Sequence, residues 1–139
     1  MAKTGTKPNY RRVRPGDGVR VLEVRVEKAL QDAAKAAGGR AWKWSSPGQR
    51  GVPDRIVTLP GGRTALVEVK REGLRSRGRL AEPWHPDHYD PWDHPALSTL
   101  QADNLLALAK LGQRVAVVDD RDQAWEFVAQ MMADPGGGA

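Results

Sequence analysis

The chain has 139 residues and a formal net charge of +5, because 22 lysines and arginines outnumber 17 aspartates and glutamates. This length suits one domain with one hydrophobic core and is too short for two. Cysteine is absent, which excludes a disulfide framework and a thiolate metal site. The basic balance favours a polyanionic partner such as nucleic acid, although it also serves simple solubility. We see no membrane-spanning apolar run and no apolar signal segment, so we expect a cytoplasmic protein.

The first half of the chain predicts a basic arm, one helix and three strands. Residues 1–20 are rich in Lys, Arg, Gly and Pro, a composition typical of a disordered arm. Apolar residues then recur at helical spacing from about Val21 until two glycines at 38–39 end the run. The alternating segment 40–46 predicts a strand, and the Gly and Pro content of 46–53 predicts a loop. Strands are also predicted at 54–59 and 63–71, joined by a turn at 60–62.

The second half begins with an irregular segment and ends with a helix, a strand and a helix. Residues 72–95 follow no period and contain all three histidines, which predicts a long insertion that is functional or disordered. A helix should begin at a cap on Ser98 or Thr99 and end at Leu111, before Gly112. The apolar run 114–119 predicts a strand buried on both faces. A third helix is expected over 122–133, followed by a flexible tail at 135–139.

The predicted order α-β-β-β-α-β-α indicates a single α/β domain over residues 21–134. The helix between strands 63–71 and 114–119 forms a right-handed crossover, so these two strands should be parallel. The hairpin 54–71 supplies antiparallel pairing. The result is a mixed sheet with helices on its faces.

Three charged side chains lie in or beside the hairpin strands, where a core would favour Val or Ile: Asp54, Glu68 and Lys70. Side chains alternate across a strand, so Glu68 and Lys70 point to the same face. A three-residue turn at 60–62 places Asp54 directly opposite Glu68, whereas a two-residue turn would send them to opposite faces. Proline cannot donate to a strand ladder, which favours the three-residue turn.

Two opposed carboxylates repel each other unless a cation lies between them. Mg²⁺ is typically held by one or two carboxylates together with waters and phosphate oxygens of a substrate. Such a metal activates a bound water and stabilises charge on a phosphodiester, and Lys70 would orient that water or stabilise the same charge. A salt-bridged group on a half-exposed strand face is the alternative interpretation.

The residues around this hairpin resemble a known nuclease family. Asp54 followed by Glu68-Val69-Lys70 resembles the PD-(D/E)XK signature of restriction-endonuclease-like nucleases, and Pro53-Asp54 supplies the literal PD. More closely, WKWSSPGQRGVPDRIVTLPGGRTALVEVK followed by LSTLQ resembles the VRR-Nuc family, over roughly residues 22–120. The resemblance implies a restriction-endonuclease-like fold, Mg²⁺ or Mn²⁺ as cofactor, and DNA as partner.

The resemblance also implies roles for individual hairpin residues. Asp54 and Glu68 match the metal-binding carboxylates of the family. Val69 would add its backbone carbonyl to the metal site, and Lys70 matches the catalytic lysine.

Two further site residues are implied on helices. Glu27 best matches the glutamate of the family's first helix, and Glu23, one turn earlier on the same face, is its rival. Gln101 matches the helical glutamine, which would reach a metal-bound water or a phosphate. For all three residues, a plain solvated position on a helix is the alternative.

Basic and aromatic residues around the hairpin suggest contacts with DNA. Six arginines flank the proposed site and would neutralise DNA phosphates, although a solvated basic surface is the alternative: Arg50, Arg55, Arg71, Arg75, Arg77 and Arg79. Trp42 and Trp44 face the same side of one strand, where core or dimer packing is expected.

The insertion 72–95 departs from the family pattern, in which a short linker joins the two motifs. Its histidines alternate with aspartates, so a second metal site is conceivable, but the spacing matches no strong zinc template: His85, Asp87, His88, Asp90, Asp93 and His94. We expect instead a flap that contacts DNA or a dimer partner, or a partly disordered segment. Its aromatic residues would stack on unpaired bases or pack against the domain: Trp84, Tyr89 and Trp92.

The leading hypothesis is a metal-dependent DNA endonuclease. The resemblance to stand-alone members of the VRR-Nuc family implies that the protein is a homodimer and acts on branched DNA such as Holliday junctions. The alternatives are a non-catalytic nucleic-acid-binding module and a site-specific restriction-type endonuclease. The complete set of motif residues argues against the first alternative, and the small size of the domain leaves little room for the base reading that the second requires.

Overall fold

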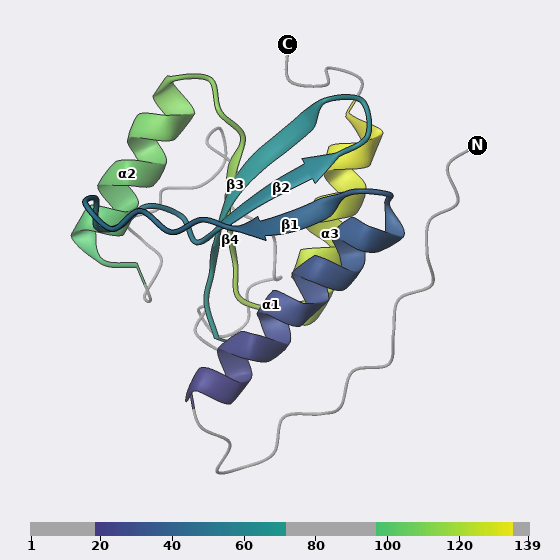
Figure 1. The fold of residues 1–139 in the computed structure, drawn as a ribbon, viewed down its shortest axis with the longest axis horizontal. Helices are drawn as coiled ribbons and strands as arrows, with labels where there is room; N and C mark the ends of the chain where they lie inside the picture. Colours follow the sequence, from purple (N-terminus) through teal and green to yellow (C-terminus); the bar gives the residue numbers. More distant parts are fainter. Residues whose placement is uncertain (1–18, 72–96, 135–139) are drawn as a thin grey trace, which may run out of the picture.

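The computed structural model describes residues 19–71 and 97–134, and its side chains from Glu23 onward. Its elements follow the predicted order (Figure 1): α1 (Val19–Ala36), β1 (Arg40–Lys43), β2 (Arg55–Leu59), β3 (Arg63–Val69), α2 (Thr99–Lys110), β4 (Val115–Val118) and α3 (Arg121–Ala133). Helix α1 begins two residues before the expected start. The predicted arm up to residue 18, the insertion 72–95 and the tail 135–139 lie outside the described residues.

Strand β1 ends at Lys43, three residues before the predicted boundary at 46. Trp44 still donates its backbone N–H to the carbonyl of Asp54 at 2.8 Å, so pairing continues for one residue beyond the strand. Pro47 follows in the loop, and a proline has no N–H to extend the ladder.

The four described strands form one sheet in the order β1-β2-β3-β4. Strand β2 pairs antiparallel with β1 and with β3, whereas β3 and β4 are parallel, as the crossover through α2 predicts. Leu59 pairs with Arg63, which confirms the three-residue turn at 60–62. Gly61 and Gly62 both have positive φ angles, of 82° and 73°, and glycine adopts this region of backbone space most readily.

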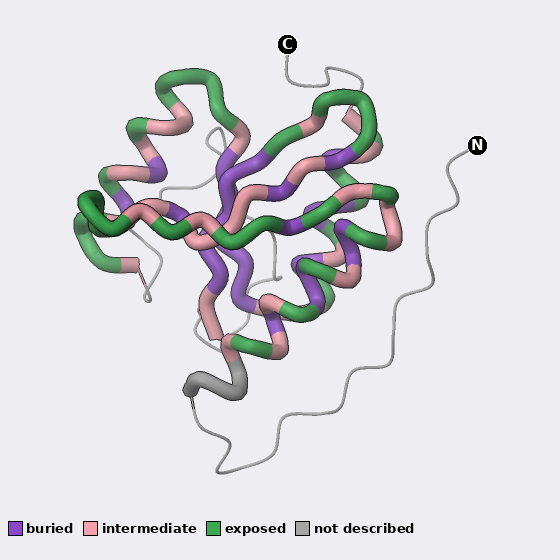
Figure 2. The backbone as a smooth tube through the Cα atoms, viewed as in Figure 1, coloured by how far each residue is buried: buried purple, intermediate pink, exposed green. Residues whose placement is uncertain are grey.

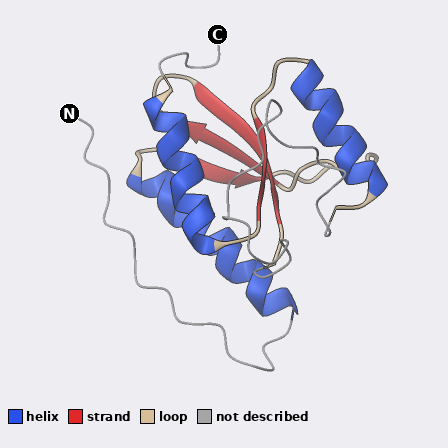
Figure 3. Cartoon of the chain, turned by 180° about the vertical axis from the view of Figure 1, so that it is seen from behind, coloured by secondary structure: helices blue, strands red, loops and turns tan. Residues whose placement is uncertain are grey.

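Helices α1 and α3 cover one face of the sheet, and α2 lies on the other (Figures 1 and 3). The larger core cluster joins the α1 and α3 face to alternate strand residues such as Val57, Val67 and Val69. The smaller cluster contains Leu66 and Leu105 on the α2 face. All four residues of β4 are buried, as expected for a strand covered on both faces (Figure 2). None of the described helices has the length and apolar content needed to cross a membrane.

The start of α2 is fixed by a capping box. Ser98 is the N-cap; its hydroxyl accepts from the backbone N–H of Gln101 at 3.1 Å, and the Gln101 side chain accepts from the Ser98 N–H at 3.0 Å. This arrangement satisfies two helix N–H groups that otherwise lack partners. It therefore holds the Gln101 side chain in a defined place at the start of α2.

Candidate active site

The site forms where β2 begins and β3 ends. Arg55 pairs with Val67, so the next step of the same register places Asp54 opposite Glu68. Asp54 is fixed there because its Oδ1 accepts from the Val69 N–H at 3.0 Å. Val69, expected from the family resemblance to offer its carbonyl to a metal, thus also uses its N–H to position Asp54.

The loop before Asp54 is held against α2. Asn104 donates to the carbonyl of Arg50 at 2.9 Å. Gly51 has a φ of +78°, and a Cβ there would lie 2.8 Å from Leu100 Cγ, too close for any other residue. Glycine is therefore required at position 51, three residues before Asp54, because the loop packs tightly on α2 and delivers Asp54 to the strand end.

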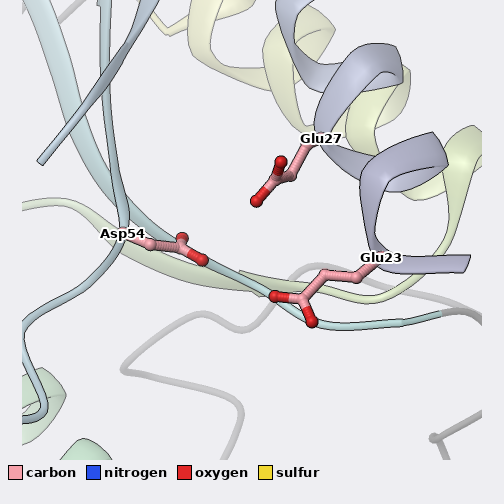
Figure 4. Close-up of side chains that lie close together, drawn as sticks. All are labelled: Glu23, Glu27 and Asp54. Atoms are coloured by element: carbon pink, nitrogen blue, oxygen red, sulfur yellow. The ribbon is translucent and has the colours of Figure 1, made fainter. Parts of the chain in front are cut away.

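Two glutamates of α1 reach Asp54 from the side of the helix (Figure 4). Glu23, Glu27 and Asp54 can each offer one oxygen such that these atoms all lie within 4.8 Å of one another. The two glutamates are four residues apart and so lie on one face of α1. The sequence presents Glu23 and Glu27 as rivals, whereas the structure brings both to Asp54.

Burial and nearby negative charge make Asp54 and Glu68 reluctant to ionise. The pKa of Asp54 is raised from 3.8 to about 6, chiefly by burial; the charges of Glu27 and Glu23 also raise it, and the hydrogen bond from Val69 lowers it. Burial also raises the pKa of Glu68 from 4.5 to about 8, assisted by the charge of Asp54 and opposed by Lys70. Without a cation, the group is therefore partly protonated at neutral pH.

The donor set fits a divalent cation. It consists of carboxylate oxygens only, the ligand type that Mg²⁺ and Mn²⁺ prefer. Burial, and to a smaller extent the neighbouring carboxylates, raise the pKa values of Asp54 and Glu68, so their ionised forms are costly here. A bound divalent cation would supply that compensation.

Lys70 lies on the other side of Glu68 and is joined to α2. Its Nζ is 3.6 Å from Glu68 Oε1 and donates to Gln101 Oε1 at 3.1 Å. Gln101 Nε2 in turn donates to the same Glu68 oxygen at 3.3 Å. Glu68 is only 5% exposed, so this closed group of three side chains sets the position of the ammonium beside the acidic cluster.

Comparison with known proteins places the chain in a family. No family model matches it. A phage protein named "Putative nuclease p44", of Acyrthosiphon pisum secondary endosymbiont phage 1, is 34% identical over 102 residues, covering 73% of this chain and 87% of the phage protein. A solved structure named "VRR_NUC domain" has the same fold, with a TM-score of 0.55 and 24% identity over 82% of this chain and 97% of that chain. The chain belongs to the same family as the phage protein "Putative nuclease p44", and it has the VRR_NUC fold.

In the structure, the six arginines that were expected to contact DNA fall into three groups. The Arg55 side chain is 11% exposed, and its Nη2 lies 3.4 Å from Glu27 Oε2, so it supports the acidic cluster from within the protein. Arg50 is exposed on the loop that packs on α2, and Arg71 is half-buried just after β3. The remaining three arginines lie outside the described residues, as do the histidines and aromatic residues of the insertion: Arg75, Arg77, Arg79, His85, His88, His94, Trp84, Tyr89 and Trp92.

The raised pKa values of Asp54 and Glu68 predict that the metal-free protein becomes less stable as pH rises. Glu68 and Asp54 hold protons in the folded state that the unfolded chain releases above about pH 4 to 5. Stability from these protons is therefore complete below that range and is lost as pH rises through about 6 and 8. We expect the Tm in EDTA to fall by more than about 5 °C between mildly acidic and mildly alkaline buffer.

Calorimetry with and without Mg²⁺ checks this expectation. Added Mg²⁺ should restore the Tm at alkaline pH, because a cation replaces the lost protons. Glu68→Gln should remove much of the pH dependence, whereas Asp103→Asn, on the exposed surface of α2, should leave it unchanged. A wild-type Tm that is equal at both pH values would contradict the assignment of the raised pKa values.

Proposed function

We propose that this protein is a divalent-metal-dependent DNA endonuclease that hydrolyses phosphodiester bonds at the acidic cluster. The observation that carries the proposal is the placement of three carboxylates within 4.8 Å of one another, next to a buried Glu68 that is paired with Lys70. Membership of a nuclease family supports the same reaction class.

Each group of this site has a distinct part in the proposed reaction. Asp54, Glu27 and Glu23 would hold Mg²⁺ or Mn²⁺, and Glu68, which lies opposite Asp54 on β3, would be a further ligand. A cation bound there lowers the pKa of water and offsets the charge of a phosphodiester. Lys70, fixed by Gln101, would stabilise the negative charge that develops on the phosphate.

We further propose that the substrate is branched DNA and that the active form is a homodimer. A four-way junction has approximate two-fold symmetry, and its resolution requires two nicks in opposed strands. The part of the domain that the structure describes carries one such cluster, and one cluster can make one nick at a time. A closed two-fold dimer supplies the second site through the same symmetry operator.

A supercoiled plasmid with an inverted repeat that extrudes a cruciform tests these proposals together. With Mg²⁺ or Mn²⁺ we expect conversion to linear DNA cut at the repeat, because a dimer places two nicks in opposed strands in one binding event. EDTA should abolish the reaction. The matched control is the same plasmid with the repeat scrambled, which should be cut much more slowly.

Each proposal has its own contrary outcome in this assay. Binding without cleavage under any metal would point to a non-catalytic nucleic-acid-binding module. Equal cleavage of the two plasmids would contradict selectivity for branched DNA. Nicked circles that never become linear, together with a monomer mass in light scattering, would contradict the dimer.

A further inference from the structure

A basic groove lies beside the edge strand β1, away from the acidic cluster. It encloses about 480 Å³ and is lined by Gln31 and Lys35 of α1, by residues 39–43 and by Arg55. We call it the β1 groove. Apart from Arg55, none of its side chains belongs to the arginine set that the sequence suggests for DNA contacts.

The β1 groove carries uncompensated positive charge. Four of its lining residues are cationic and none is acidic: Lys35, Arg40, Lys43 and Arg55. Arg55 is paired with Glu27. Within residues 19–71 and 97–134, Lys35 and Lys43 have no ion-pair partner. A hollow with this charge favours a ligand that carries several negative charges.

The groove and the acidic cluster lie along one face of α1. Glu23, Glu27, Gln31 and Lys35 follow one another at four-residue spacing, so the face changes from acidic to basic along the helix. From Glu27 to Lys35 the helix rises about 12 Å. At the duplex rise of about 3.4 Å per nucleotide this distance corresponds to about three to four nucleotides, and an extended unpaired strand covers it with fewer.

Arg55 marks the boundary between the two sites. It lines the groove and contacts Glu27 on its other side. With the amide oxygen of Gln31 turned toward the guanidinium, Gln31 accepts from Arg55 Nη1 and Nη2 at 3.1 and 3.2 Å. A strand that leaves the acidic cluster along α1 therefore reaches the groove after passing one guanidinium.

An exposed aromatic stack lies on the same edge strand. Its two residues, Arg40 and Trp42, alternate with Lys43 along β1, so their side chains lie on the other face of the sheet from Lys43. Trp42 is 44% exposed, and the Arg40 guanidinium carbon lies 3.9 Å from its ring centroid. The indole N–H donates to Thr58 Oγ1 at 2.8 Å, which fixes the ring on β1. Flat aromatic and guanidinium groups held in this way stack well on unpaired bases. An acidic peptide would need the positive charges but not this stack.

We propose that the β1 groove binds an unpaired segment of the DNA substrate. Lys35 and Lys43 contact its phosphates a few nucleotides from the bond that is cut, and a base that reaches over the edge of β1 stacks on the Arg40–Trp42 pair. The choice of DNA rests on the proposed function, whereas the preference for an unpaired polyanionic strand rests on the charge of the groove and the stack on β1.

Binding is measured by fluorescence anisotropy of a labelled oligodeoxythymidylate in EDTA, where no cleavage is needed. Lys35→Glu should weaken binding by about tenfold or more and reduce the steepness of the salt dependence by about one phosphate contact. The matched control is Lys110→Glu, since Lys35 and Lys110 are the basic residues in the last turns of α1 and α2. The affinity of the Lys110→Glu control for the oligonucleotide should fall by less than about twofold, because Lys110 lies outside the groove. Lys43→Glu is a second groove variant and should behave as Lys35→Glu does.

Trp42 variants test the stacking part. Trp42→Ala should lower affinity for the single strand about tenfold, with a smaller effect on a duplex of equal length, and Trp42→Phe should retain most of it. Thermal melting of each variant confirms that it is folded.

Equal losses for Lys35→Glu and Lys110→Glu, or equal effects of Trp42→Ala on single strand and duplex, would overturn the proposal. The wild-type plasmid assay is read separately. If the wild-type protein does not cleave DNA in the presence of metal, the proposed function is contradicted. The binding data in EDTA still test whether the β1 groove binds single-stranded DNA.

Discussion

Asp54→Asn is expected to reduce DNA cleavage by at least about 10²–10³-fold, since it removes the charge at the centre of the acidic cluster. Asparagine has nearly the same shape, and its amide oxygen can still accept from the Val69 N–H. The loss should therefore come from weaker metal binding and not from unfolding. Initial cleavage rates across a range of Mg²⁺ concentrations measure both the loss of rate and the weaker metal binding.

The same variant should be more stable than the wild type in EDTA at alkaline pH. Burial makes the ionised Asp54 costly, and its pKa of about 6 means that it is mostly ionised there. Asp103→Asn removes one negative charge from the exposed surface of α2 and serves as the control for net charge. If Asp54→Asn cleaved as fast as Asp103→Asn at low Mg²⁺, Asp54 would have no part in metal binding.

Lys70→Ala is expected to lower the cleavage rate by about 10²-fold or more while DNA binding in EDTA changes little. The reason is that Lys70 is 16% exposed and held by Glu68 and Gln101, so its charge is directed at one point beside the carboxylates. One such contact contributes far more to stabilising a reacting phosphate than to overall affinity. Single-turnover cleavage and anisotropy, measured on the same DNA, separate the two contributions.

Lys110→Ala is the matched control, because it removes an exposed lysine at the other end of α2. Lys70→Arg keeps the positive charge but changes its shape, and is expected to recover only part of the rate. Full activity in Lys70→Ala would remove the lysine from the mechanism.

Gln101 should act as a positioning residue for Lys70. Gln101→Ala and Ser98→Ala both break the capping box of α2, so both should lower the Tm to a similar extent. Only Gln101→Ala also removes the hydrogen bond to Lys70, and it should therefore lose about tenfold more activity. Equal activity in these two variants would show that Gln101 caps α2 and does not position Lys70 for the reaction.

The amino-acid sequence by itself determined the order of the elements and the register of the hairpin. The length of the turn 60–62, with its proline and two glycines, is a local property, and counting back from it was sufficient to place Asp54 opposite Glu68. The end of α2 was also predictable, because Gly112 adopts a φ of +86° just beyond it. Strand β1 was predicted too long, since alternation alone does not show where a loop leaves the sheet edge.

Only the tertiary structure decided which groups meet at the site. Whether Glu23, Glu27 or both reach Asp54 depends on how far and at what angle α1 crosses the sheet, and helical spacing does not specify this. The pairing of Arg55 with Glu27 joins residues 28 positions apart, so no local pattern reveals it. The β1 groove has the same origin, because α1 and the edge strand form it together. Local sequence thus sets the chemistry of each element, and the packing of α1 on the sheet sets which charges become neighbours.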